Sequence, residues 1–441
     1  MDAMPPEPRR PVNVSKPLTG PSLAEVAARV DQAGALLASV AAVTPLERDA
    51  RLSDLTGAEV WLKREDLQPI RSYKLRGAYT MISQLSAQAQ RAGVVCASAG
   101  NHGQGVAWAC ARLGIPGRVF VPTTTPRQKR DRIRALGGRD VELIVAGETY
   151  EAAADLAAGE AASLGYTLVP AFDDLWTLSG QGTVAAEIAA QLGRPPDVLL
   201  VPVGGGGLLA GCGAWFRTNL PSTRLVGVEP AGAACVVAGL AAGRPVNLAS
   251  LDSFVDGAAV RRAGALTLPL IQQLDCDLVA LPEGQACSEM LALYQTDGII
   301  AEPAGALASA GLRRGPHDVT VEIEPGQTVV AIVSGGNNDV SRYSEVLERS
   351  LIHEGRKHYF LVSFPQEPGA LRRFLDDVLG PDDDVVLFEY TKKSNRETGP
   401  ALVGIELGDA DDLPGLLARV AASPMQVESI APSSPFYRYL V

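Results

Sequence analysis

The sequence lacks paired cysteines, long apolar runs and an excess of basic charge, and each absence excludes a class of protein. None of its six cysteines forms a C-x-x-C pair, which fits a reducing cytosol. No run of about 18 apolar residues is present, so no transmembrane helix is expected. The formal net charge of −11 argues against nucleic acid or an anionic membrane as a partner. We therefore expect a cytoplasmic protein. The negative net charge does not argue against a small anionic ligand that binds in a local pocket.

Size and composition predict a large α/β protein. A chain of 441 residues is too long for one ordinary domain, and its 45 glycines suit an enzyme with many tight strand-to-helix turns. The hydrophobic fraction of 46% and the charged fraction of 20% are typical of a well-packed soluble protein. Residues 1–22 are rich in proline and have no apolar signal core, so we expect a disordered tail there.

Lysine is also scarce before residue 350, which draws attention to Lys74 in the stretch SYKLRGA, residues 72–78. This lysine follows a strand-like run at 59–66 and opens a helical pattern that we expect to continue to about residue 90. The dipole of a helix favours anions at the N-terminus, so an amine placed there loses its proton more easily. A neutral amine is a nucleophile, and Lys74 is therefore a candidate catalytic residue.

From residue 23 onward, short apolar strands alternate with helical patterns. Continuous runs of valine, isoleucine and leucine, such as 197–203 and 328–336, are typical of a parallel sheet that is covered on both faces. We expect a two-lobed α/β catalytic domain over residues 23–345, in which residues from about 70 to 165 form an inserted smaller lobe.

The pattern changes near residue 345. Residues 346–356 are predicted to be a linker, and residues 357–441 follow the order strand, helix, strand, strand, helix, strand. That order is typical of a ferredoxin-like unit. The sequence therefore predicts a separate C-terminal domain.

A glycine-rich loop in VPVGGGGLLAG, residues 201–211, follows a buried strand and precedes a helix. Backbone amides at such a place can cradle a phosphate. A rival interpretation also fits, because Gly205, Gly207 and Ala210 match G-x-G-x-x-A. Glu229 ends the next strand, where an acidic residue would bind the ribose of a dinucleotide. The loop alone leaves nicotinamide, another phosphorylated cofactor and a purely structural turn open.

Three further turns carry polar residues. Asn101 and His102 lie in SAGNHGQG at 98–105, where amides at a helix start could hold a carboxylate, although Asn-His is also common in plain turns. Glu302 lies in AEPAGA, and Ser334 follows a sheet strand, where each could equally serve a helix terminus. A hydride-transfer site has no need for Lys74, whereas a Schiff base to an aldehyde cofactor does.

Together these residues resemble the fold type II pyridoxal-phosphate enzymes and, within them, the threonine dehydratases (threonine ammonia-lyases). The motifs that match are SYKLRGA for the cofactor lysine, SAGNHGQGVA for the substrate loop, VPVGGGGLLAG for the phosphate loop, SGGN for the pyridine-nitrogen loop, DGAAVRRAG and AEPAGA. The similarity covers almost the whole chain. Its C-terminal part resembles the single ACT-like regulatory domain of the shorter biosynthetic enzymes.

The resemblance implies a pyridoxal 5'-phosphate cofactor and a role for each matching residue. Lys74 would bond to the cofactor aldehyde and later move the Cα proton of the substrate. The residues implied in cofactor binding are Lys74, Tyr73 (where the family usually has phenylalanine), Asn101, Gly204, Gly205, Gly206, Gly207, Leu208, Glu302 and Ser334. Those implied in gripping the substrate carboxylate are Ser98, Ala99, Gly100, Asn101 and His102. No metal site is implied, because Ala233 and Cys235 leave the acidic cluster of the family's racemases incomplete.

The resemblance also implies an activity and its control. The expected reaction converts L-threonine to 2-oxobutanoate and ammonia by α,β-elimination, with L-serine to pyruvate as a second reaction, in isoleucine biosynthesis. A neutral Ser334 at the pyridine nitrogen would favour expulsion of the β-hydroxyl, and Ala99 lacks the hydroxyl that the racemases use. Isoleucine, and valine as a second candidate, would act through the C-terminal domain of a homotetramer. We expect the effector site at residues 365–369, before a helix start.

The residues also leave three other functions open. A β-replacement enzyme of the same fold is disfavoured by His102, because the sulfhydrylases resemble S-G-N-T instead. A nicotinamide dehydrogenase would use Gly205, Gly207 and Glu229. An amino-acid sensor with a dead catalytic core is disfavoured by the intact Lys74 and Asn101.

Overall fold

The computed structural model describes residues 18–392, 395–423, 425–431, 434, 437 and 440. Most of the expected disordered tail, residues 1–17, lies outside the described residues. The chain divides into two compact units, and each is described separately. The first comprises Met1–Arg314 with Asp318–Asn338, and the second comprises Gly315–His317 with Asp339–Val441. Within the described ranges, no helix is long and apolar enough to cross a membrane.

The first unit is built on a six-stranded sheet with the order β1-β2-β10-β7-β8-β9. Its strands are β1 (Leu46–Arg48), β2 (Glu59–Arg64), β7 (Val198–Pro202), β8 (Arg224–Pro230), β9 (Asp277–Leu281) and β10 (Thr328–Val333). All neighbours run parallel except β1, which pairs with β2 in the antiparallel direction. Every residue of β7 and β10 is buried, which confirms the covered parallel sheet that the continuous apolar runs predict.

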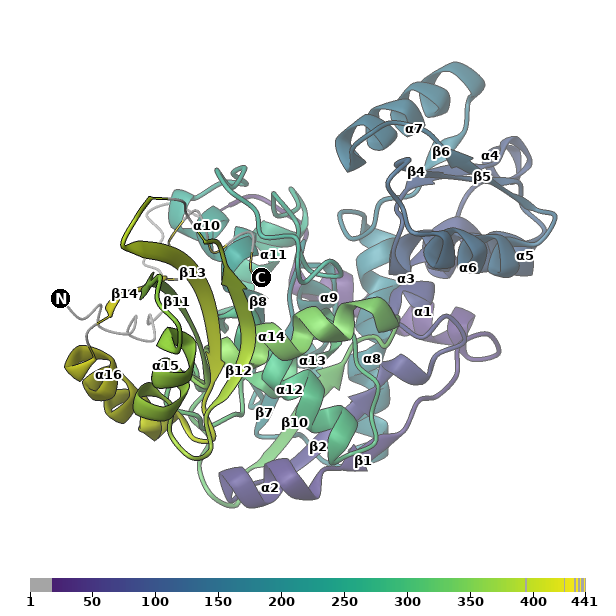
Figure 1. Cartoon of the computed structure of the whole chain (residues 1–441). Coiled ribbons are helices and arrows are strands. Elements are labelled where there is room, and N and C mark those ends of the chain that lie inside the picture. Colours follow the sequence, from purple (N-terminus) through teal and green to yellow (C-terminus); the bar gives the residue numbers. More distant parts are fainter. Residues whose placement is uncertain are drawn as a thin grey trace. The chain divides into compact units, whose positions relative to one another are not determined.

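A second parallel sheet in the same unit has the order β5-β4-β3-β6. Its strands are β3 (Val94–Ala97), β4 (Gly117–Val121), β5 (Val141–Val145) and β6 (Thr167–Leu168). Figure 1 shows α7 (Tyr150–Leu164) on one face, and α5 (Asn101–Leu113) and α6 (Arg127–Gly137) on the other. The two parallel sheets and their helices confirm the α/β fold class.

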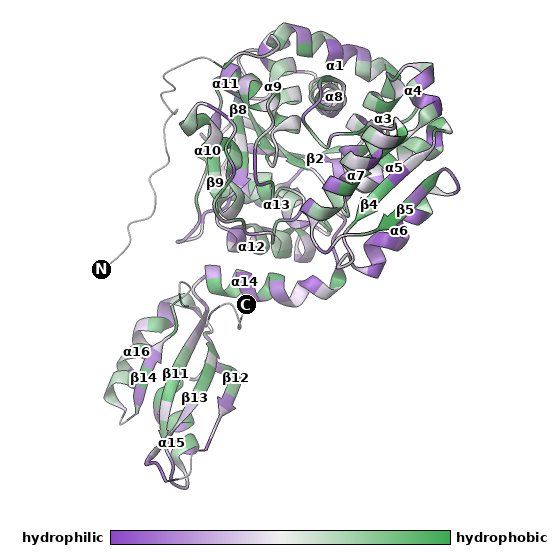
Figure 2. Cartoon of the chain, turned by 90° about the horizontal axis from the view of Figure 1, so that it is seen from above, coloured by the Kyte–Doolittle hydropathy of each residue, from purple (hydrophilic) through white to green (hydrophobic). Residues whose placement is uncertain are grey.

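Helix α8 (Leu175–Leu192) is the centre of a helical cluster in the first unit. Figure 2 shows α8 end-on, with α1 (Leu23–Leu37), α3 (Lys74–Ser83) and α9 (Gly207–Asn219) around it. The other helices of this unit are α2 (Ala50–Thr56), α4 (Ala87–Ala92), α10 (Cys235–Ala242), α11 (Thr267–Leu274), α12 (Glu283–Gln295) and α13 (Pro303–Ala310). Helix α8 packs against both α3, which begins at Lys74, and α9, which follows the glycine loop.

The helix that opens at Lys74 is shorter than the sequence predicts. It ends at Ser83, and a separate helix, α4, begins at Ala87. The Ser86 side chain accepts a hydrogen bond from the Ala89 amide, so it caps α4 and interrupts the expected single helix. Helix α8 begins at Leu175, where the Asp174 side chain caps the amides of Trp176 and Thr177.

The second unit is an antiparallel sheet with the order β12-β13-β11-β14. Its strands are β11 (Lys357–Pro365), β12 (Asp384–Tyr390), β13 (Thr398–Glu406) and β14 (Gln426–Ser429), and its helices are α14 (Tyr343–His353), α15 (Ala370–Val378) and α16 (Leu413–Ala422). From β11 onward the order strand, helix, strand, strand, helix, strand is confirmed. Helix α14 occupies most of residues 346–356, which the sequence suggests as a linker.

Close packing around α8 depends on residues without side chains. A Cβ atom on Gly180 would lie 2.5 Å from the Arg76 carbonyl oxygen of α3. A Cβ atom on Gly211 of α9 would lie 2.2 Å from the Leu178 carbonyl oxygen. These helices therefore approach backbone to backbone, which no larger residue would permit.

We expect Gly180→Ala to lower the free energy of unfolding by about 1–3 kcal/mol, because the added methyl group overpacks the α3–α8 contact. The matched control is Gly159→Ala on α7, where a Cβ atom would meet nothing within 4 Å. That change should raise the free energy of unfolding by about 0.5–1 kcal/mol, since alanine is the better helix former. Urea unfolding of both variants measures the difference. Equal effects in the two variants would contradict the packing argument.

Candidate active site

Lys74 stands at the start of α3, where its side chain points to a backbone carbonyl rather than to a carboxylate. Its Nζ donates to the Ala171 oxygen at 3.0 Å, and lies 5.2 Å from the centre of the Tyr73 ring. Burial lowers the pKa of Lys74 to about 8, against the opposing attraction of Glu302. The lowered pKa that the sequence suggests is therefore present, and its main cause is desolvation.

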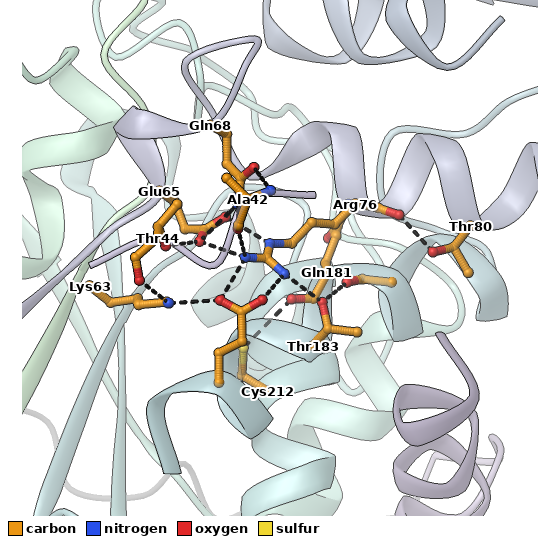
Figure 3. A network of polar contacts seen from close by, with 12 residues as sticks. Ala42, Thr44, Lys63, Glu65, Gln68, Arg76, Thr80, Gln181, Thr183 and Cys212 are labelled. Atoms are coloured by element: carbon orange, nitrogen blue, oxygen red, sulfur yellow. Dashed lines mark hydrogen bonds and ion pairs between the residues drawn. The ribbon is translucent and has the colours of Figure 1, made fainter. Parts of the chain in front are cut away.

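A network of buried charges fixes the helix that carries Lys74 (Figure 3). The Arg76 guanidinium donates to both oxygens of Glu65 at 2.8 Å, and to Glu187 of α8 at 2.6 and 2.9 Å. Lys63 of β2 donates to the same Glu187 at 2.7 Å. Two positive and two negative groups thus balance one another, and they tie α3 to β2 and α8.

Two carbonyl groups of the glycine loop are occupied by side chains from other parts of the chain. Thr267 donates from Oγ1 to the Gly205 oxygen at 2.6 Å, and Cys235 donates from Sγ to the Gly204 oxygen at 3.4 Å. Gly206, just before the helix, gives it no side-chain cap. The first amides of α9, including that of Leu208, are therefore left for an anion.

The backbone of this loop requires glycine at two positions. Gly206 has a φ of 91°, in the left-handed region that other residues rarely adopt. A Cβ atom on Gly205 would lie 2.4 Å from the Phe172 ring. The loop is therefore a cradle that side chains would fill, and its residues fit a phosphate group held by amides.

Glu229 is not placed to bind a ribose. Its side chain is fully buried, and its two oxygens accept from the amides of Val236 and Val237 at 2.8 and 2.9 Å. Burial raises the pKa of this carboxyl to about 8. The dinucleotide interpretation of the loop is therefore not supported. In the described part of the chain, no group of three His, Cys, Asp or Glu residues could hold a metal ion.

Asn101, Glu302 and Asn337 form a partly buried polar cluster near Lys74, in which Glu302 is the buried member. Asn101 donates from Nδ2 to Glu302 at 2.6 Å, and Asn337 donates from Nδ2 to the Asn101 oxygen at 2.7 Å. Burial, followed by the charge of Asp256, raises the pKa of Glu302 to about 7. The sequence motifs predicted site roles for Asn101 and Glu302 but none for Asn337, although Asn337 lies in the SGGNND turn.

His102 is a structural neighbour of Lys74 in this arrangement. Its Nε2 lies 2.8 Å from the Val169 oxygen, and since a carbonyl only accepts, Nε2 carries the proton. Burial, followed by the charge of Lys74, lowers the pKa of His102 to about 4. The imidazole is therefore neutral near pH 7 and does not act there as a charged acid.

The start of α5 offers amides to a second anion. The turn over Ser98, Ala99 and Gly100 precedes it, and the Gly100 amide donates to the Ser98 hydroxyl at 3.3 Å. Gly100 gives α5 no side-chain cap, so the first amides of the helix can bind a carboxylate.

Ser334 lies directly after β10, next to the start of α3. Its hydroxyl donates to the Ala304 oxygen at 3.2 Å, and its carbonyl oxygen accepts from the Tyr73 amide at 3.2 Å. This places Ser334 beside the turn that carries Lys74.

A segment that the sequence did not single out, residues 169–174, joins these parts. The Val169 oxygen accepts a hydrogen bond from His102, and the Ala171 oxygen accepts from both Lys74 and Gln181. The Asp173 carboxylate accepts from the amides of Ala265 and Leu266, both at 2.8 Å. No local pattern marks this segment, because its contacts reach residues about a hundred positions away.

We expect Glu302→Gln to lower the pKa of Lys74 by about one pH unit in cofactor-free protein, since the attraction of the carboxylate for the ammonium is lost. The pH dependence of Lys74 modification by an amine-reactive reagent, followed by peptide mass spectrometry, measures this. Glu142→Gln, which removes an exposed carboxylate paired with Arg118, is the control and should leave the midpoint unchanged. An unchanged midpoint in Glu302→Gln would refute the coupling.

Each of the two units matches a known protein family. A family model described as "Pyridoxal-phosphate dependent enzyme" matches residues 38–335. A second model, described as "C-terminal regulatory domain of Threonine dehydratase", matches residues 348–440. Together the two models cover nearly all of the described chain.

Individual relatives agree with these models. "L-threonine dehydratase biosynthetic IlvA" of Mycobacterium tuberculosis strain H37Rv is 58% identical over 428 residues, 96% of this chain and 98% of the relative. The protein of the same name from Bacillus subtilis strain 168 is 46% identical, over 90% of this chain and 93% of the relative.

Solved structures agree as well. The processed form of threonine deaminase isoform 2 from Solanum lycopersicum is 37% identical, with a TM-score of 0.71 over 79% of this chain and 99% of that chain. Maize serine racemase is 28% identical, with a TM-score of 0.65 over 74% of this chain and 98% of that chain. The chain therefore belongs to the pyridoxal-phosphate-dependent enzymes and, within them, to the biosynthetic L-threonine dehydratases.

Proposed function

We propose that the chain converts L-threonine to 2-oxobutanoate and ammonia by α,β-elimination, and L-serine to pyruvate by the same route. The observation that carries this proposal is Lys74, an amine whose pKa is lowered to about 8, in the same unit as an amide cradle that fits a phosphate. The similarity to threonine dehydratases supplies the substrate. We place this reaction in isoleucine biosynthesis in the cytoplasm.

The cofactor site is formed by residues that fit pyridoxal phosphate. When bound, this cofactor supplies an aldehyde for an amine and an electron sink that acidifies the Cα–H bond of an amino acid. The residues assigned to hold it are Lys74, Tyr73, Asn101, Glu302, Ser334, Gly204, Gly205, Gly206, Gly207 and Leu208. Amides at the start of α9 would bind the phosphate.

Lys74 would take the Cα proton. A base works best when its pKa lies near the operating pH, and a pKa of about 8 leaves a useful fraction of neutral amine at pH 7 to 8. Once protonated, Nζ can return to the Ala171 oxygen, which holds it without adding a counter-charge. This position keeps the proton carrier ready for the next turnover.

The turn before α5 would hold the substrate carboxylate. Amides of residues from Ser98 to His102 lie at a helix start, where an anion is favoured. Ala99 brings no hydroxyl to this turn, and the His102 ring is neutral and bonded to Val169. Lys74 therefore stands without a partner acid or base in this turn, which supports elimination rather than racemisation.

Lys74→Ala should reduce 2-oxobutanoate formation by about a thousandfold or more, because the proton carrier is lost. The absorbance of the lysine-bound cofactor should disappear with it. The control is Lys392→Ala, which removes an exposed lysine of the second unit and should leave both readings unchanged. Full turnover in Lys74→Ala would overturn the proposal. An assay with O-acetylserine and sulfide, expected to give no product, separates elimination from β-replacement.

Regulation would belong to the second unit, in a homotetramer that isoleucine inhibits. The candidate effector site is the turn Pro365–Gly369 before α15, whose first amides can bind the carboxylate of an amino acid. Gly369 has a φ of 89°, so this turn depends on glycine. The match to a regulatory-domain model over residues 348–440 supports a regulatory role for the unit.

Isoleucine should inhibit threonine turnover in the intact enzyme, and Gly369→Ala should weaken that inhibition about tenfold, because a strained turn displaces the helix-start amides. The control, Gly355→Ala, imposes similar left-handed strain at the opposite end of β11 and should keep isoleucine sensitivity. Activity titrated with isoleucine measures both.

Two outcomes would contradict this assignment. Insensitivity of the intact enzyme to isoleucine would leave the unit a structural one. Loss of sensitivity in Gly355→Ala alone would move the effector site to the cavity of about 520 Å³ that Gly355 lines.

A further inference from the structure

One backbone carbonyl group in the active site accepts hydrogen bonds from two side chains. The Ala171 oxygen accepts from Lys74 Nζ at 3.0 Å and from Gln181 Nε2 at 3.0 Å. Gln181 lies on α8 and is fully buried. It was not among the residues that the sequence or the family resemblance marked, so its function is open.

The orientation of the Gln181 amide follows from its partner. A carbonyl oxygen only accepts hydrogen bonds, so the amide nitrogen must face Ala171 and the amide oxygen must face away. That oxygen, Oε1, is buried and has no partner in the described part of the chain. It lies 2.5 Å from the position that a Cβ atom on Gly207 would take. The same side chain therefore reaches from the partner of Lys74 to the glycine loop.

Gln181 is also held firmly in place. Its neighbour Gly180 packs against the Arg76 carbonyl group, and Thr183 of the same helix accepts from the Arg76 guanidinium at 3.1 Å. Figure 3 shows Gln181 beside this buried charge network. A rigid helix thus carries the amide that contacts Ala171.

We propose that Gln181 is a positioning residue for Lys74, which fixes the Ala171 carbonyl as the acceptor of Nζ and limits how strongly that carbonyl holds the ammonium form. The inference rests on the proposed role of Lys74 as the proton carrier. Two donors share one acceptor, and the positive end of the Gln181 amide dipole points to the same oxygen as Nζ. Both effects favour the neutral amine.

Each of the other groups that face Lys74 either raises the pKa of its amine or leaves it without a charged neighbour. Glu302 attracts the ammonium form and raises the pKa of Lys74, and the face of the Tyr73 ring attracts a cation as well. His102 is neutral and bonded to Val169. Gln181 therefore opposes Glu302 and Tyr73, without adding a charge of its own.

The test measures the pKa of Lys74 in cofactor-free protein, through the pH dependence of its modification by an amine-reactive reagent. Gln181→Met keeps the length of the side chain and removes the amide, so the midpoint should rise by about half to one pH unit. Gln181→Glu should raise the midpoint further, because a carboxylate attracts the ammonium. The control is Ser179→Ala, which removes a buried hydroxyl without a described partner from the same helix and should leave the midpoint unchanged.

Activity of the loaded enzyme provides the second readout. In Gln181→Met the acidic limb of the kcat profile, which reports groups of the enzyme–substrate complex where the Lys74 amine is free, should move to higher pH by the same amount. Ser179→Ala should keep the wild-type profile. An unchanged Lys74 midpoint in a folded Gln181 variant, verified by circular dichroism, would overturn the inference. If Gln181→Met does not fold, Gln181→Leu, which also removes the amide without adding a charge, decides instead. Failure of the proposed function is distinguishable, since Lys74→Ala would then keep its turnover.

Discussion

The buried charge network around Arg76 is the constraint on which the active site depends. Arg76 and Lys63 are paired with Glu65 and Glu187, and removing one partner would leave an uncompensated buried charge at a cost of about 3–5 kcal/mol. The network locks the end of β2 to α3 and α8. Lys74 lies two residues before Arg76, so the position of the lysine follows from it.

Burial, rather than pairing, sets the charge state of the groups around Lys74. Desolvation lowers the pKa of Lys74 to about 8 and of His102 to about 4, and it raises the pKa of Glu302 to about 7. All three shifts favour the neutral form. Lys74 and Glu302 can therefore exchange protons near neutral pH, while the stable charges lie in the network around Arg76.

The elements that local pattern determines could be predicted from the sequence. Apolar runs gave the buried strands β7 and β10, and glycine turns gave the cradle before α9. The helix break at Ser86 was missed, because a serine cap competes with a continuing helical pattern. Gln181 and residues 169–174 could not be predicted, because their roles arise from contacts between distant parts of the chain.

Lys74 donates its hydrogen bond to a carbonyl group rather than to a carboxylate, and this affects its pKa. A carboxylate at that place would hold the ammonium form and raise the pKa of the amine beyond a useful range. The nearby carboxylate, Glu302, is instead occupied by the amides of Asn101 and Asn337. The Ala171 oxygen, shared with Gln181, holds the amine in place but binds its proton only weakly. The lysine can thus be fixed in position and still give and take a proton.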